Sequence, residues 1–255
     1  MNLLISFRSE ILKTKRTASY YLTLVAAAFI PFILLLNICI SGMSQDKLSK
    51  DPLNSIFGAE FQMTGFAIFP MFVILIGTLL PQIEYKNNTW KQVLASPQTK
   101  ANVFMAKFLN IHLLLLVFLV ANHLFAFLVA VVAHFVAPAL HVLAQPLDGY
   151  ALLTRSINAY ISLLAVSSIQ FWMGLRFKNF IVPVGIGLAC WFAGSLLVLE
   201  SHSPFGNYFP YSFHVFSNFP EYKSQLPTTQ WTSLGYAALF LVIGFIDFRR
   251  RRMSA

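Results

Sequence analysis

Six long stretches of this 255-residue chain contain no Asp, Glu, Lys or Arg. They are 21, 23, 25, 19, 20 and 16 residues long, and a helix needs about 17 to 25 apolar residues to cross the hydrocarbon core of a bilayer. The stretches are residues 20–40, 61–83, 108–132, 157–175, 180–199 and 231–246. Only 11% of the residues are charged, against about 25% in soluble domains. The sequence therefore predicts an all-α membrane protein, with residues 1–255 as one domain of six transmembrane helices.

The Lys and Arg residues are sorted between the two sides of such a domain. Fourteen lie on the side that carries both termini, and four lie on the other side, namely Lys47, Lys50, Arg155 and Lys223. Since cytoplasmic loops are enriched in Lys and Arg, we expect both termini in the cytoplasm. The basic excess then needs no nucleic acid to explain it. The first stretch follows basic residues, as in a signal peptide, but 21 residues is too long, so we expect a retained helix.

The segment before the first stretch, residues 1–19, carries an apolar face. Leu3, Leu4, Phe7 and Ile11 recur at helical spacing, with basic residues near the opposite side. This pattern predicts an interfacial helix that lies in the lipid headgroups. A solvated tail is the alternative.

The outer loop 200–230 is rich in aromatic residues, with eight of them between Phe205 and Tyr222, and it also contains four prolines. We expect short pieces that re-enter the interface or pack against the outer ends of the spans. The alternative is an aromatic belt that only anchors the chain.

Polar but uncharged residues lie in or beside the spans. They either hydrogen-bond neighbouring helices or line a substrate path, and the candidates for the path are Asn37, Gln62, Thr64, Asn158 and Gln170. The spans carry no acid or base that would form a proton relay. The sequence also contains no P-loop motif and no hydrolase or metalloprotease signature.

Three histidines, His112, His123 and His134, recur every eleven residues in the third span. Eleven residues correspond to about 16 Å along a helix, so no two of these side chains share one metal ion. No other span offers a histidine as a haem partner. We therefore predict hydrogen bonds between helices and no metal site.

The loop 84–107 has the features of a short cytoplasmic helix. Trp90, Val93 and Leu94 fall at positions i, i+3 and i+4, and Pro97 ends the run. Such an apolar stripe rests either in the lipid interface or in a groove of another protein.

Signals for helix starts flank this short helix. Asn87 and Asn88 are suited to cap its beginning. A second helix is expected to begin near Thr99 and to continue through Phe104 into the third span.

The same loop resembles that of permease subunits of type 2 ABC exporters, most closely the lantibiotic-immunity group of bacterial permeases. The resemblance lies in an acid leaving the second span, an Asn/Thr-Trp pair, an apolar short helix, a proline and a lysine entering the third span. In this sequence the matching residues are Glu84, Thr89, Trp90, Val93, Leu94, Pro97 and Lys107. The order of an N-terminal interfacial helix, six spans and an aromatic loop extends the likeness over the chain.

The resemblance implies a membrane subunit without its own nucleotide site, in a bacterial cytoplasmic membrane. It implies that the short helix is a coupling helix that contacts a separate ATPase subunit, which would hold ATP and Mg²⁺, while this chain holds no cofactor. The expected contact residues are Glu84, Tyr85, Asn88, Thr89, Trp90, Val93 and Leu94. It further implies pairing with a second permease chain, like or unlike, and an outer loop that re-enters the membrane.

The apolar spans favour an amphipathic or lipid-like cargo, such as a peptide antibiotic, a lipid or a drug, in contact with membrane lipid. A membrane-embedded enzyme or a structural assembly subunit is the alternative. An enzyme would need clustered acids, histidines or a nucleophile, which the spans do not provide.

Overall fold

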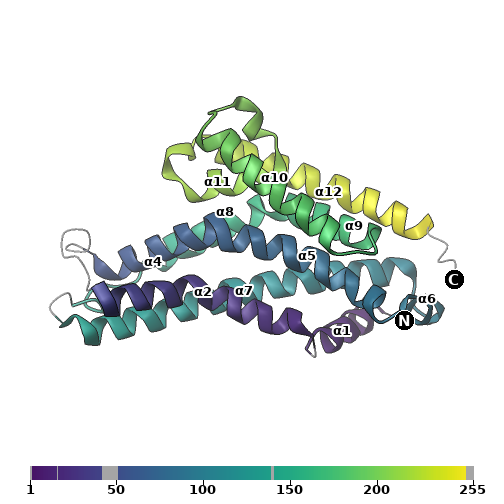
Figure 1. The fold of residues 1–255 in the computed structure, drawn as a ribbon, viewed down its shortest axis with the longest axis horizontal. Helices are drawn as coiled ribbons and strands as arrows, with labels where there is room; N and C mark the ends of the chain where they lie inside the picture. Colours follow the sequence, from purple (N-terminus) through teal and green to yellow (C-terminus); the bar gives the residue numbers. More distant parts are fainter. Residues whose placement is uncertain (1, 16, 42–50, 139–140, 251–255) are drawn as a thin grey trace.

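A computed structural model describes residues 2–15, 17–41, 51–138 and 141–250. Every regular element within these ranges is a helix, as predicted for an all-α membrane protein. The elements are α1 (Leu3–Thr14), α2 (Ala18–Ser41), α4 (Pro52–Met63), η1 (Thr64–Ile68), α5 (Phe69–Lys86), α6 (Trp90–Ala95), α7 (Lys100–Val136), α8 (Gly149–Ser162), α9 (Leu164–Arg176), α10 (Ile181–Leu199), η3 (Pro204–Asn207), η4 (Pro210–Ser212), α11 (Phe213–Asn218), η5 (Pro220–Tyr222) and α12 (Leu226–Arg250). They form an elongated bundle with α6 at one end, which we call the α6 end (Figure 1).

Five helical segments in the described ranges are long and apolar enough to cross a membrane, and α8 with α9 makes a sixth. Five of the six predicted stretches lie wholly in these segments, and the fifth, 180–199, begins one residue before its segment. Two segments are much longer than predicted, because Pro52–Lys86 has 35 residues and Lys100–Val136 has 37. The prediction stopped at charged residues, whereas Glu60, Glu84 and Lys107 are at most 1% exposed inside the bundle. The helices thus extend past the charge-free stretches and hold these three buried ionisable residues beyond the predicted limits.

The fourth predicted span is bent by 41° between α8 and α9. No proline causes the bend. The hydroxyl of Ser233 on α12 donates to the carbonyl of Ile161 at 2.7 Å and accepts from the amide of Ala165 at 3.2 Å. In an uninterrupted helix these two backbone groups would bond to each other. A side chain inserted into the ladder of backbone hydrogen bonds is a known cause of kinks.

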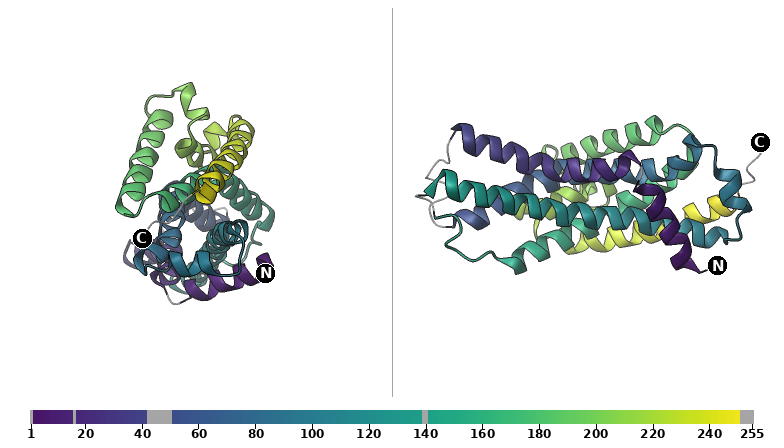
Figure 2. Two further views of the ribbon diagram at one scale, coloured as in Figure 1. Left: turned by 90° about the vertical axis from the view of Figure 1, so that its right-hand side faces the viewer. Right: turned by 90° about the horizontal axis from the view of Figure 1, so that it is seen from below.

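Three helix pairs make the main contacts of the bundle. α2 packs along α7, and α9 packs against both α5 and α12. The end-on view in Figure 2 shows α10 and α12 on the opposite side of the bundle from α2. The core between α5 and α7 is aromatic, since Phe118 stacks on Phe72 and Phe69 with ring centroids 4.6 and 5.2 Å apart. This packing holds α5 and α7 in fixed register along their length.

Two of the three span histidines make the predicted hydrogen bonds between helices. His112 bonds to the hydroxyl of Tyr160 at 2.8 Å, and His123 bonds to the hydroxyl of Ser156 at 2.8 Å. Both pairs join α7 to α8. His134 contacts Phe135 on its own helix.

The aromatic outer loop folds into short helices, as its prolines predict. Tyr211, Phe213 and Phe216 are buried, and η4 packs against α10. Phe205 and Tyr208 are more than half exposed. The loop therefore packs against the spans through one part of its aromatic set and leaves another part free for the interface.

Candidate functional site at the α6 end

A tight turn joins α5 to the short helix α6. α5 ends at Lys86, and the amide of Thr89 then turns back to donate to the carbonyl of Glu84 at 3.0 Å. Asn88 between them has a φ of 53°, in the left-handed region that asparagine tolerates. The N-cap of α6 is Thr89, which makes no side-chain capping bond. The predicted capping role of Asn87 and Asn88 is therefore wrong, since these residues form the turn that ends α5.

The end of α6 matches the sequence pattern more closely. The hydroxyl of Ser96 donates to the carbonyl of Val93 at 2.6 Å, and Pro97 follows in the connecting segment. Thr99 then caps α7 by accepting from the amide of Asn102 at 3.2 Å. The predicted second helix from Thr99 is thus the first turns of α7.

Trp90 lies inside the protein, at 5% exposure. Its ring contacts Tyr85 of α5 and Phe248 of α12, with centroid distances of 5.5 and 5.7 Å. The ammonium of Lys107 on α7 lies 5.5 Å from the ring centroid, within the range of a cation–π interaction. Both predicted resting places, lipid and another protein, are therefore wrong for this side chain. Trp90 fastens α6 to three long helices of its own chain.

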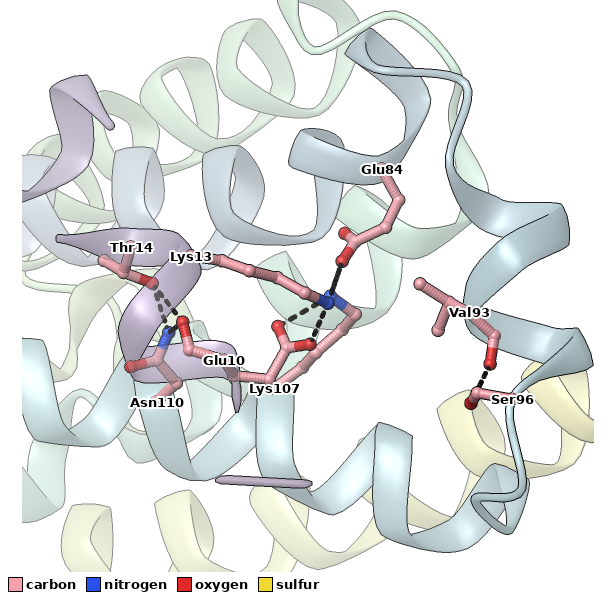
Figure 3. Close-up of polar contacts among 8 residues, drawn as sticks. All are labelled: Glu10, Lys13, Thr14, Glu84, Val93, Ser96, Lys107 and Asn110. Carbon is pink, nitrogen blue, oxygen red and sulfur yellow. Dashed lines mark hydrogen bonds and ion pairs between the residues drawn. The ribbon is translucent and has the colours of Figure 1, made fainter. Parts of the chain in front are cut away.

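A cluster of four charged residues, of which Glu10, Glu84 and Lys107 are buried and Lys13 is partly exposed, lies beside Trp90, and we call it the ion cluster (Figure 3). Lys107 bonds to Glu84 of α5 and, at 2.8 Å, to Glu10 of α1. Lys13 of α1 bonds to the same two carboxylates, to Glu10 at 2.6 Å and to Glu84 at 3.2 Å. Two ammonium groups and two carboxylates thus balance each other, and they join α1, α5 and α7.

The electrostatics of the ion cluster favour its charged form. Burial alone would raise the pKa of the Glu10 carboxyl, but the nearby ammonium groups of Lys107 and Lys13 outweigh burial and hold that pKa below its ordinary value. For Lys13, burial would lower the pKa, and the carboxylates of Glu10 and Glu84 outweigh it and raise the pKa. Removing one partner of a buried ion pair costs about 3–5 kcal/mol, because it leaves an uncompensated charge.

The N-terminal helix α1 docks on α7 through a polar face. Ser6, Glu10 and Thr14 are its buried residues. The amide of Asn110 on α7 donates to the Thr14 hydroxyl at 2.6 Å. Leu4, on the predicted apolar face, is 77% exposed. Phe7 and Ile11 are partly buried beside the polar residues that hold α1 to the bundle, so only part of the predicted apolar face is exposed. The sequence pattern did not reveal the polar docking.

A family model described as ABC-2 family transporter protein matches residues 6–194, about three quarters of the chain. The match begins in α1 and continues through α6 into α10. The chain belongs to the ABC-2 transporter family. It is a multi-pass membrane permease subunit. A comparison with curated proteins finds no match, and the resemblance to the lantibiotic-immunity group stays a prediction.

In this ABC-2 permease the predicted ATPase-contact residues divide between the interior and the surface. Three are held inside or against the bundle, because Glu84 and Trp90 are buried and the hydroxyl of Tyr85 donates to the carbonyl of Leu175 at 2.6 Å. Asn88 is exposed, and Thr89 and Val93 are partly buried. The side chain of Leu94 lies outside the described part of the structure. The exposed side chains of α6 itself are Lys91, Gln92 and Ala95.

Thr64, a predicted path residue of the ABC-2 permease, belongs to a buried polar group. Its hydroxyl donates to the carboxylate of Glu60 at 2.6 Å. The amide of Asn122 on α7 donates to the same oxygen at 2.7 Å and to the carbonyl of Ala27 on α2 at 3.0 Å. Glu60 is fully buried. The contacts of Asn122 join α2, α4 and α7, and Thr64 supports this group by bonding to Glu60.

The side-chain amide of Gln170 is likewise hydrogen-bonded within the bundle. The amide accepts from the hydroxyl of Thr78 on α5 at 3.0 Å and donates to the hydroxyl of Tyr211 in the outer loop at 3.1 Å. Asn37 on α2 is exposed and far from this pair in the chain.

Gln62 and Asn158 are brought together by the fold. Both line one pocket between α4, α8 and α11. Gln62 is exposed, and Asn158 accepts a hydrogen bond from the amide of Gln230 on α12 at 2.9 Å. Of the five predicted path residues, these two line this pocket of the described structure together.

Sequence reasoning missed Glu10, Lys13 and Asn110 as parts of the site, and it assigned Lys107 no partner. The sequence did contain a signal for the contact between Glu84 and Lys107. An acid that leaves one span and a lysine that enters the next lie near the same membrane level, because consecutive spans run antiparallel. For Glu10 no such signal existed, since the docking of α1 on α7 depends on tertiary contacts.

Proposed function

We propose that this ABC-2 permease is the membrane-spanning subunit of an exporter powered by ATP that a separate subunit hydrolyses. In this proposal the α6 end faces the cytoplasm of a bacterium and the ATPase subunit docks there. A second permease chain, like or unlike, completes the transporter. ATP and Mg²⁺ bind to the partner subunit and not to this chain.

The observation that carries the proposal is the anchorage of α6. A docked subunit transmits movement to a membrane domain only through an element that is firmly attached to its spans. Trp90 attaches α6 to α5 and α12, and it touches Lys107 of the ion cluster, which continues to α7 and α1. Displacement of α6 therefore acts on four helices at once.

The docking face in this proposal is the exposed side of α6. Lys91, Gln92 and Ala95 point away from the bundle, opposite the buried Trp90. This assignment differs from the contact set expected from sequence, in which Trp90 itself touched the ATPase. The buried residues of that set transmit the movement, and the exposed ones make the contact.

The proposed cargo is amphipathic or lipophilic. The spanning segments are strongly apolar, and Glu60, an acid between α2, α4 and α7, is fully buried and hydrogen-bonded. The described helices thus expose mainly apolar surface to a passing molecule. Stimulation of ATP hydrolysis by amphipathic compounds in the reconstituted complex tests this part of the proposal.

The docking proposal is tested by charge reversal on the exposed face of α6. We expect the double variant Lys91→Glu/Gln92→Glu to lower co-purification with a co-expressed P-loop ATPase subunit by about tenfold, the effect of about 1.4 kcal/mol at an interface. Its unfolding temperature should stay unchanged, because both side chains are exposed.

The matched control is Lys223→Glu/Gln225→Glu, which changes the net charge by the same amount on the side of the bundle away from α6. The control should leave co-purification intact. Equal association of both double variants with the ATPase would contradict the docking proposal.

A further inference from the structure

A pocket of about 560 Å³ lies between α4, α8 and α11, away from the α6 end. Pockets that bind small molecules occupy about 300–1,000 Å³. In Figure 1 its walls lie on the opposite half of the bundle from α6. This pocket takes no part in the proposed docking of an ATPase.

Two cations line the pocket and no acid does. They are Arg155 of α8 and Lys223, which precedes α12. Arg155 also lines a smaller neighbouring cleft with Asp51 and Asp148. Among the described residues, neither Arg155 nor Lys223 forms an ion pair with these or any other carboxylates. Both charges are therefore available to an anionic ligand.

Aromatic rings form the apolar wall of the pocket. Phe61 of α4, Phe216 of α11 and Phe219 all line it, and Phe61 and Phe216 are at most 5% exposed in the protein as a whole. The amides of Gln62 and Asn158 lie on the same surface. A ligand that uses both parts of this lining carries a negative group next to an apolar chain or ring.

The wall of the pocket is fixed to the spans. Asn218, at the end of α11, donates from its amide to the carbonyl of His214 at 2.7 Å. It packs against Gly65 of η1 so closely that a Cβ on that glycine would lie 2.0 Å from the Asn218 side-chain oxygen. Close packing of this kind keeps the pocket preformed, which lowers the entropy cost of binding.

We propose that this pocket binds the anionic headgroup and the adjoining apolar part of an amphiphile. A phosphate or carboxylate would bond to Arg155 and Lys223, and the apolar part would lie on Phe61 and Phe219. That this binding is a step in export rests on the proposed function. It restricts the cargo of the proposed exporter to anionic amphiphiles. The binding itself needs no ATPase. Cationic amphiphiles are disfavoured, because the pocket lining itself has two positive charges and no acid.

The test measures binding to the purified full-length chain in phosphatidylcholine nanodiscs, with empty nanodiscs as the partition blank. We expect saturable binding of dodecyl phosphate and none of dodecyltrimethylammonium. The double variant Arg155→Ala/Lys223→Ala should bind dodecyl phosphate about tenfold more weakly, since charge-assisted hydrogen bonds are lost. Lys178→Ala, at a pocket on the other side of the bundle, is the control and should bind as the unchanged chain does.

Equal saturable binding of the two probes, or unchanged binding by the double variant, would overturn the proposal. A second experiment identifies the source of the ligand by adding phosphatidylglycerol to the nanodiscs. Competition with dodecyl phosphate assigns the pocket to a membrane lipid, and lack of competition assigns it to a free anionic amphiphile. Because no ATPase is present, failure of this binding test leaves the proposed docking at α6 standing, and failure of docking leaves this result standing.

Discussion

The protein places its charges differently on its two sides. At the α6 end, Lys107 and Glu84 are buried and paired, and with Glu10 and Lys13 they join helices far apart in the sequence. In the pocket away from α6, Arg155 and Lys223 are exposed and have no carboxylate partner among the described residues. Buried paired charges serve the structure, since losing one partner is costly. Exposed unpaired charges cost little to remove and are free to meet a ligand.

The sharpest test of this contrast removes Lys107. We expect Lys107→Ala to destabilise the protein by about 4 kcal/mol, because Glu84 and Glu10 then remain buried with one shared cation. Unfolding in detergent by heat or denaturant measures the loss. Adding Glu84→Gln to Lys107→Ala should recover part of it, since one uncompensated charge is gone. A double variant less stable than Lys107→Ala would show that Glu84 does not depend on Lys107.

The next effect concerns the attachment of α6. Trp90→Ala should cost about 3 kcal/mol, the range for truncating a buried aromatic residue, and it should uncouple α6 from α5 and α12. Trp90→Phe keeps a ring against Tyr85 and Phe248 and should cost much less. Thermal unfolding of the two variants checks this order. If both variants had the stability of the unchanged chain, Trp90 would be a surface residue and its assigned anchoring role would be wrong.

The sequence predicted the helix α6 but not the residues that surround Trp90. The spacing of Trp90, Val93 and Pro97 was sufficient to predict the short helix and its end. A periodic apolar stripe shows that one face is covered, but it does not show what covers it. Here part of the cover is Phe248, at the far end of the chain, which no local pattern connects with Trp90.

A smaller loss of stability is expected at acidic pH. The pKa of Glu10 in the folded protein lies below its ordinary value of 4.5 because Lys107 and Lys13 outweigh its burial. A carboxylate of this kind contributes stability above pH 4.5, and the contribution is lost as the pH falls below that value toward the lowered pKa. Stability measured against pH should therefore decline below about pH 4.5, and Glu10→Gln should flatten that decline. An identical decline in Glu10→Gln would assign it to other carboxyl groups.

The smallest change in stability is expected when the two pocket cations are removed. Arg155→Ala/Lys223→Ala should change the free energy of unfolding by less than about 0.5 kcal/mol, as is usual for exposed side chains without partners. The same unfolding assay used for Lys107→Ala measures it. A loss as large as that of Lys107→Ala would mean that the pocket cations support the fold, and the distinction between the two sides would fail.

The rest of the fold also contains features that local sequence specifies and features that depend on tertiary contacts. Charge-free stretches were sufficient to place six spans, because a long apolar helix is specified by its own residues. Charge was a poor guide to where helices end, since Glu60, Glu84 and Lys107 are neutralised or hydrogen-bonded by distant helices. The bend at Leu163 was also unpredictable, because the hydroxyl that causes it belongs to Ser233. Local patterns specify helices, whereas buried polar contacts between helices depend on the tertiary fold.

Site-specific photo-crosslinking of the complex with its ATPase subunit tests the central proposal most directly. A photoreactive residue at position 91 or 92, on the exposed face of α6, should crosslink to the ATPase, and one at position 223 or 225 should not. No crosslink from 91 and 92, or an equal crosslink from 223 and 225, would contradict docking of a separate ATPase at α6.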